Sequence, residues 1–64
     1  MIINGKQMDY PHGVRLAAVL KKENFRMERI AVELNGEIVS KSKYEEVILK
    51  EEDHLEVVSF VGGG

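Results

Sequence analysis

Leu55-Glu56-Val57-Val58-Ser59-Phe60-Val61 is the strand that decides the fold of this chain, and it runs directly into Gly62-Gly63-Gly64. Alternation places Leu55 and Val57 on one face of this strand, and Val58 and Phe60 on the other. A strand that is apolar on both faces is typical of a central position in a sheet. We therefore expect it to pair in parallel with the first strand of the chain, so that one helix can cover the sheet.

The three final glycines predict a flexible tail, made of Gly62, Gly63 and Gly64, that follows a single domain of residues 1–61. Glycine loses more backbone freedom on ordering than any other residue, and terminal residues are ordered only when packing holds them. A tail without side chains can enter a narrow cleft in a partner protein. A frayed end or a linker remnant is the plainer interpretation, so the rest of the chain has to decide.

The composition describes a small, cysteine-free and mildly acidic protein. Its 64 residues suffice for one domain, and without cysteine there is no thiolate for a disulfide, a metal or a nucleophile. No signal peptide and no apolar run of about 20 residues is visible, so we expect a cytoplasmic protein with no membrane partner.

The charge is distributed unevenly along the chain. Residues 1–32 carry six basic and three acidic side chains, whereas residues 33–64 carry three basic and eight acidic ones. An acidic half argues against a nucleic-acid partner and favours a basic protein surface. A solvated acidic face without a partner is the simpler interpretation of the charge alone.

Two hairpins are predicted from their turns. Asn4-Gly5 and Asn35-Gly36 are typical of type I′ turns, which need a positive φ at both central residues. The strands that these turns join are expected at 1–3, 6–10, 30–34 and 37–39.

Between the hairpins, an apolar period of 3.6 residues predicts one helix over 14–23, with Asn24 as a left-handed residue after its end. We expect 40–43 to be a loop, and 44–49 to be a helical turn that leads into a short bridge. The elements together predict an α+β fold in which a mixed sheet of four to five strands holds one main helix.

No set of side chains assembles a nucleophile, a base and an oxyanion site, so the chain is not expected to be an enzyme. Glu51-Glu52-Asp53 beside His54 resembles a metal site, but adjacent residues on a tight turn rarely converge on one ion. We expect a surface turn there and no metal. His12 and His54 lack the i, i+4 spacing of a zinc helix and are expected to be exposed.

The remaining reactive group is the terminal carboxylate of Gly64. An α-carboxyl group is ionised at neutral pH and resists nucleophiles, so it must be activated before it reacts. An acyl adenylate, made from ATP by another enzyme, is the economical route. Side chains at the last positions would obstruct that chemistry, which gives Gly63-Gly64 a reason to be glycine.

Several motifs follow one another along the whole chain: Asn4-Gly5, Leu16-Ala17-Ala18-Val19-Leu20, Val32-Glu33-Leu34-Asn35-Gly36-Glu37-Ile38-Val39, Tyr44-Glu45-Glu46-Val47, Asp53-His54-Leu55-Glu56-Val57-Val58 and Phe60-Val61-Gly62-Gly63-Gly64. In this order they resemble the ThiS family, the small sulfur carriers of thiamine biosynthesis.

Two positions depart from the family. Glu51-Glu52-Asp53 replaces an Asp-Gly-Asp type of turn, and Arg15 stands where a Ser or Thr helix cap is usual, at a cost of about 1 kcal/mol.

The resemblance implies a ubiquitin-like β-grasp fold and a carrier function. It implies that an E1-like activating enzyme of the ThiF type uses ATP to adenylate Gly64, and that a sulfur donor protein then supplies the sulfur of a thiocarboxylate. The sulfur would pass to a thiazole synthase of the ThiG type, which builds the thiazole ring of thiamine. No bound cofactor is implied, and we expect the free protein to be a monomer.

Val58, Phe60 and Val61 are the residues expected to bind these partners. If the helix covers only the Leu55 face of the last strand, the side chains of Val58 and Phe60 form an exposed apolar patch, and such patches often mark partner surfaces. Cover from the 44–49 segment is the alternative.

Two other functions remain open at the level of sequence. A molybdopterin-synthase small subunit or a tRNA-thiolation carrier has the same fold and ends in Gly-Gly. The molybdopterin type is usually longer, with prolines before the tail, whereas the only proline here is Pro11. A ubiquitin-like modifier belongs to another class, because its terminal carboxylate forms an amide with a lysine.

Overall fold

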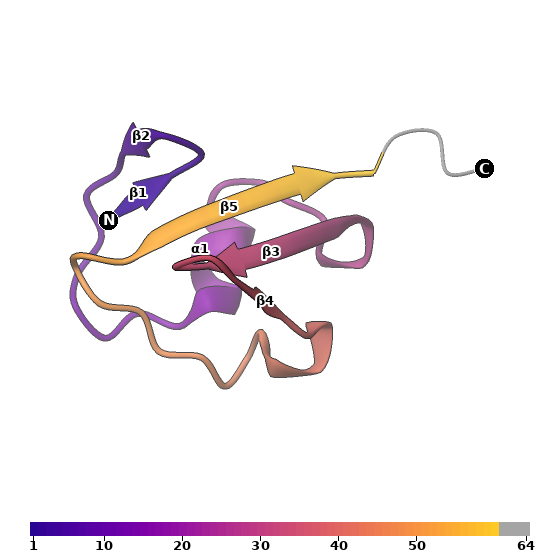
Figure 1. Cartoon of the computed structure of the whole chain (residues 1–64). Helices are drawn as coiled ribbons and strands as arrows, with labels where there is room; N and C mark the ends of the chain where they lie inside the picture. The colour runs from indigo at the N-terminus through magenta and orange to yellow at the C-terminus, as the bar shows by residue number, and fades with distance from the viewer. Residues whose placement is uncertain (61–64) are drawn as a thin grey trace.

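The computed structural model describes residues 1–60, which form a five-stranded mixed sheet with one α-helix against one of its faces (Figure 1). The elements are β1 (Ile2–Ile3), β2 (Lys6–Gln7), α1 (Leu16–Lys22), the 3-10 helix η1 (Met27–Arg29), β3 (Ile30–Leu34), β4 (Glu37–Val39), the 3-10 helix η2 (Lys41–Lys43) and β5 (His54–Ser59). This arrangement confirms the predicted α+β fold. The predicted tail and the domain boundary at residue 61 lie outside the described residues.

β5 is the central strand of the sheet, as its two apolar faces predict. The strand order is β2-β1-β5-β3-β4. β5 pairs in parallel with β1, where Ile3 lies opposite Leu55, and antiparallel with β3, from Ile30–Ser59 to Leu34–Leu55. The hairpins β1–β2 and β3–β4 therefore flank the last strand on its two sides.

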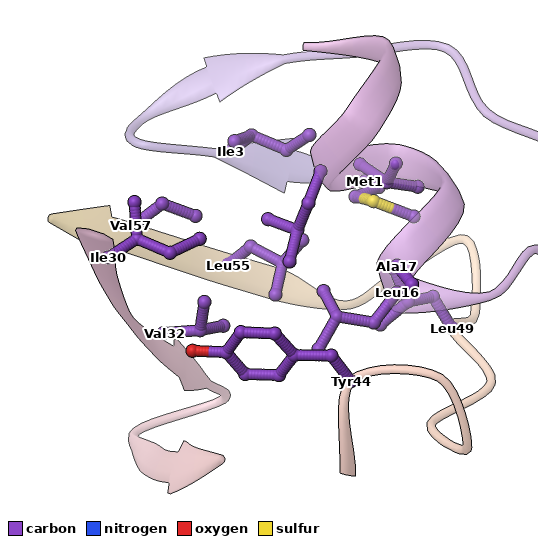
Figure 2. Close-up of a cluster of buried hydrophobic side chains, with 12 residues drawn as sticks. Met1, Ile3, Leu16, Ala17, Ile30, Val32, Tyr44, Leu49, Leu55 and Val57 are labelled. Carbon is purple, nitrogen blue, oxygen red and sulfur yellow. The ribbon is translucent and has the colours of Figure 1, made fainter. Parts of the chain in front are cut away.

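The core lies between the sheet and α1 (Figure 2). Val32 of β3 and Leu55 of β5 are fully buried, and so is Leu16 of α1. Figure 2 shows Tyr44 and Leu49 pointing into this same core. The 44–49 segment thus lies on the helix side of the sheet, and the alternative in which it covers Val58 and Phe60 is wrong.

The same segment explains why the helix begins at Leu16 and not at residue 14. Arg15 forms an antiparallel bridge with Ile48, so the backbone before Leu16 is extended. The side chain of Arg15, the residue at the N-cap, makes no capping hydrogen bond. Instead, the N–H of Leu16 donates to the carbonyl of Val47 at 2.9 Å, and that of Ala17 donates to the carbonyl of Tyr44 at 2.9 Å. Backbone carbonyls of a distant segment thus satisfy donors that a Ser or Thr cap would otherwise bind.

Two other predictions differ in detail. The strand expected at 6–10 ends at Gln7, after which the N–H of Met8 donates to the carbonyl of Met1 at 2.8 Å. The loop expected at 40–43 contains η2. The helix ends at Lys22, one residue before the predicted end. The left-handed residue after it is confirmed, because Asn24 has a φ of 66° and the N–H of Phe25 donates to the carbonyl of Leu20 at 2.9 Å.

The first Asn-Gly turn does more than reverse the chain. Asn4 has a φ of 51° and Gly5 a φ of 80°, as a type I′ turn requires. In addition, Oδ1 of Asn4 accepts a hydrogen bond from the N–H of Val57 at 2.7 Å, and Nδ2 donates to the carbonyl of Val57 at 3.2 Å. The side chain of Asn4 therefore continues the β1–β5 ladder beyond the end of β1.

The second Asn-Gly turn holds the start of β5. Asn35 has a φ of 51°, and its Oδ1 accepts a hydrogen bond from the N–H of His54 at 2.9 Å. Its Nδ2 donates to Oδ1 of Asp53 at 3.0 Å, while Oδ2 of Asp53 accepts from the N–H of Lys50 at 2.8 Å. Asp53 was predicted on a surface turn and is instead buried, because its carboxylate joins the turn before β5 to the β3–β4 hairpin.

Replacing Asn4 by glycine tests the hydrogen bonds of its side chain separately from its backbone conformation. Glycine tolerates the positive φ but removes both bonds to Val57, so Asn4→Gly should lower the free energy of unfolding by about 1–2 kcal/mol in urea denaturation. Asn24→Gly is the matched control, since it makes the same exchange at a positive φ after α1. It should change the free energy by less than about 0.5 kcal/mol. Equal effects of the two substitutions would show that the Asn4 side chain does not hold β5.

A second test concerns Tyr10, whose hydroxyl donates a hydrogen bond to Oε2 of Glu23 at the end of α1. Burial, together with the bond to the Glu23 carboxylate, raises the pKa of Tyr10 from 10.0 to about 12. Because folding raises this pKa, the protonated hydroxyl of Tyr10 stabilises the folded protein. This stabilisation is complete below pH 10 and is lost as the pH rises through about 12. Tyr10→Phe should lower the free energy of unfolding by about 1 kcal/mol at pH 7. The difference in unfolding free energy between wild type and Tyr10→Phe should decrease from pH 10 upward. A difference that does not change with pH would contradict the raised pKa of Tyr10.

Candidate functional site

The last strand presents apolar side chains on the face of the sheet that α1 leaves open. Leu55 and Val57 of β5 are buried against the helix, while Val58 is 60% and Phe60 is 57% exposed. In Figure 1, α1 lies on the far side of β5 and β3, so this other face is open toward the viewer. The exposed patch expected at Val58 and Phe60 is present. Val61, the third residue expected to bind partners, lies outside the described residues.

Neighbouring strands extend this patch. Ala31 of β3 pairs with Val58 and is exposed. Ile38 of β4 is 79% exposed and pairs with Glu33 of β3. Sequence reasoning missed Ile38, although alternation contained the signal: its neighbour Val39 pairs with the buried Val32, so Ile38 must point the other way.

Acidic side chains lie among these apolar ones. Glu33 pairs with Ile38 on one side and with Glu56 of β5 on the other. Both glutamates are exposed. We call this surface the open face, and it consists of Ala31, Glu33, Ile38, Glu56, Val58 and Phe60.

The open face extends to Phe60, the last residue that the structure describes. The N–H of Phe60 donates to the carbonyl of Arg29 at 2.7 Å, which continues the β3–β5 ladder beyond the end of β5. The chain is therefore held as far as Phe60. The predicted reactive residue Gly64, together with Gly62 and Gly63, lies outside the described residues.

The other side chains considered in the sequence do not come together as a site. His12 and His54 are exposed, as predicted. Within residues 1–60, there is no group of three or more His, Asp or Glu side chains able to hold a metal ion, and no pocket is found. No helix in this part of the chain is long and apolar enough to cross a membrane.

A mixed sheet of this order, with a parallel pair formed by its first and last strands and one helix on one face, defines a ubiquitin-like β-grasp domain. The family model of the ThiS family matches residues 1–64. The chain therefore belongs to the ThiS family.

Curated relatives and solved structures agree with this membership. The sulfur carrier protein ThiS of Bacillus subtilis is 35% identical over 63 residues, which cover 97% of this chain and 96% of that protein. A crystal structure of the thiamine biosynthesis protein ThiS from Geobacter metallireducens has a TM-score of 0.78 and 29% identity, covering 98% of this chain and 96% of that one. A thiazole synthase of Paramagnetospirillum magneticum is 38% identical over 64 residues, but the chain spans only 20% of its length.

Proposed function

We propose that this protein is a sulfur carrier whose terminal Gly64 is adenylated and then converted to a thiocarboxylate, which delivers sulfur for the thiazole moiety of thiamine. The observation that carries the proposal is the similarity, over 97% of this chain, to a sulfur carrier protein of nearly the same length. The fold supports it in one respect. A central strand that is held up to Phe60 provides a firm base for a reactive end.

The chemistry assigned to Gly64 has three steps. A carboxylate oxygen attacks the α-phosphorus of ATP, which forms an acyl adenylate and releases pyrophosphate. The outer sulfur of a persulfide on the donor protein then attacks the acyl carbon and AMP leaves, which forms an acyl disulfide. A thiol attacks the donor's sulfur in this disulfide, so that the donor leaves as a mixed disulfide with that thiol and the thiocarboxylate remains on Gly64. ATP belongs to the activating enzyme, and this chain contributes the acyl group. Without cysteine, the chain has no thiol that could carry the sulfur as a persulfide.

The proposed partners are an adenylating enzyme of the ThiF type, a sulfur donor protein and a thiazole synthase of the ThiG type. Two relatives support the last of these. The thiazole synthase of Paramagnetospirillum magneticum contains a region that is 38% identical to this chain, and that of Magnetococcus marinus contains one that is 40% identical. A carrier region within the same polypeptide as a thiazole synthase is consistent with a direct transfer between the two. We place the protein in the cytoplasm, where ATP is available, as a monomer when free.

The proposal predicts a change of mass at Gly64. Incubated with its activating enzyme, ATP and a sulfur source, the protein should gain the mass difference between sulfur and oxygen, because one carboxylate oxygen is replaced. Intact-mass measurement detects the gain, and fragment spectra should place it on the last residue.

Two altered chains control this experiment. Deleting Gly64, or converting its carboxylate to an amide, should abolish the gain of mass. Both chains should keep their unfolding free energy, because the core residues of the described part of the chain lie within residues 1–57. A gain that maps to an internal residue, or no gain under conditions that load a known carrier, would falsify the sulfur-carrier function.

Phe60 provides a further prediction for the activating enzyme. Phe60→Ser removes exposed apolar surface, so the free energy of unfolding should change by less than about 0.5 kcal/mol. If Phe60 is an anchor of the interface, the enzyme should bind the variant at least tenfold more weakly, which corresponds to a loss of about 1.4 kcal/mol. Val57→Ser is the contrasting variant, since Val57 is buried and its loss should destabilise the fold. Unchanged binding by a folded Phe60→Ser variant would remove Phe60 from the interface.

A further inference from the structure

The two Asn-Gly turns are chemically reactive as well as structural. In an Asn-Gly sequence the backbone nitrogen of the glycine can attack Cγ of the asparagine side chain, because the glycine has no Cβ to block the approach. The new N–C bond closes a succinimide ring, and Nδ2 leaves as ammonia. Water then opens the ring at one of its two carbonyls, which gives aspartate or isoaspartate. Asn4-Gly5 and Asn35-Gly36 are the two sequences of this kind in the chain.

The backbone of the two turns does not distinguish the two sites. Asn4 and Asn35 both have a φ of 51°, and the glycines that follow them have φ values of 80° and 87°. Both asparagines are exposed, and each side-chain amide is held by two hydrogen bonds. These bonds must break before the side chain can turn toward the glycine nitrogen and lose Nδ2. The two sites therefore differ in what each amide binds.

The amide of Asn4 is bound to a buried residue of the central strand. Its Oδ1 accepts from the N–H of Val57 and its Nδ2 donates to the carbonyl of Val57, a residue that is 6% exposed. Release of the Asn4 side chain leaves both of these backbone groups without their partner. Because buried backbone groups are costly to leave unpaired, this release is strongly disfavoured in the folded protein.

The amide of Asn35 is bound at the end of β5, where the groups that it leaves behind keep other partners. Its Oδ1 accepts from the N–H of His54, which is an exposed residue, so water can replace this bond. Its Nδ2 donates to Oδ1 of Asp53, and Oδ2 of that carboxylate keeps its bond to the N–H of Lys50 after the release. Local opening is therefore easier at Asn35 than at Asn4.

We propose that Asn35 is a deamidation site of the folded protein, and that the hydrogen bonds of Asn4 to Val57 protect Asn4-Gly5 from the same reaction. The reaction consumes water and releases ammonia, and it needs no enzyme or cofactor. It does not depend on the proposed carrier function.

The product weakens the contact that held Asn35. An aspartate at this position lacks the donor that bonds to Oδ1 of Asp53 and places a second negative charge against that carboxylate. Since Asp53 is 7% exposed, water screens this repulsion poorly. An isoaspartate in addition lengthens the backbone of the turn. Both products loosen the connection between the β3–β4 hairpin and the start of β5, so a molecule that has reacted at Asn35 unfolds more readily.

The test follows the asparagines of the intact chain by peptide mapping and mass spectrometry in mildly alkaline buffer. In the folded protein, Asn35 should convert about tenfold faster than Asn4, as expected if release of Asn4 leaves one more polar group unpaired. In concentrated urea the two rates should agree within about twofold, because unfolding frees both amides. Asn24 is the internal control, since it precedes Phe25 and should not react over the same time.

The relative rates decide the proposal. A rate at Asn4 that equals or exceeds the rate at Asn35 in the folded protein would overturn it. An Asn35 that reacts only in urea would also overturn it, because the turn would then be closed as firmly as the first one.

A pair of variants tests the effect of the product on stability. Asn35→Asp reproduces the aspartate and should unfold at a lower urea concentration than the wild type. The exchanged variant Asn35→Asp/Asp53→Asn has the same net charge as the wild type and again sets an amide against a carboxylate. It should recover most of the lost stability. An exchanged variant as unstable as Asn35→Asp would contradict the charge repulsion assigned to the deamidated turn.

Discussion

The parallel pairing of β1 with β5 is the interaction on which the rest of the structure depends. It joins segments from opposite ends of the described chain, so it closes nearly all of the described residues into one loop. Each Asn-Gly turn then adds a side chain that binds the backbone of β5 or the residue before it: Asn4 at Val57, and Asn35 at His54 and Asp53. The last strand is therefore held on both sides from His54 to Val57, and by β3 alone at Val58 and Ser59. Its inner face completes the core and its outer face is presented to solvent.

On the helix side of the sheet, the 44–49 segment likewise connects separate parts of the fold. It contributes Tyr44 and Leu49 to the core, and its carbonyls accept the first N–H groups of α1. In a chain this short, with no disulfide, few residues are available for a core. One irregular segment that both packs and caps the helix compensates for a helix with no side-chain cap. The helix start and this segment should therefore order together.

Local sequence patterns were sufficient to predict most elements. They failed where a contact with residues distant in the sequence sets a boundary or the burial of a side chain. Alternation and turn residues predicted the hairpins, the central place of β5 and its two faces, because these depend on neighbours in sequence. The late start of α1 and the burial of Asp53 depend on hydrogen bonds to residues far along the chain. The open face was predicted only in part. Val58 and Phe60 lie on one strand, whereas Ile38 and the glutamate pair become neighbours through the register of three strands.

The point at which the sheet ends limits the reach of the last residues in the proposed function. The backbone is held in the ladder as far as Phe60, and an extended chain from Phe60 to Gly64 spans at most about 14 Å. If Gly64 is adenylated as proposed, an enzyme that contacts Phe60 must have its reaction centre within roughly that distance of Phe60. Under the proposed function, an enzyme that binds the domain would hold the carboxylate of Gly64 within the reach of a few residues, and this would raise the effective concentration of the carboxylate at the nucleotide.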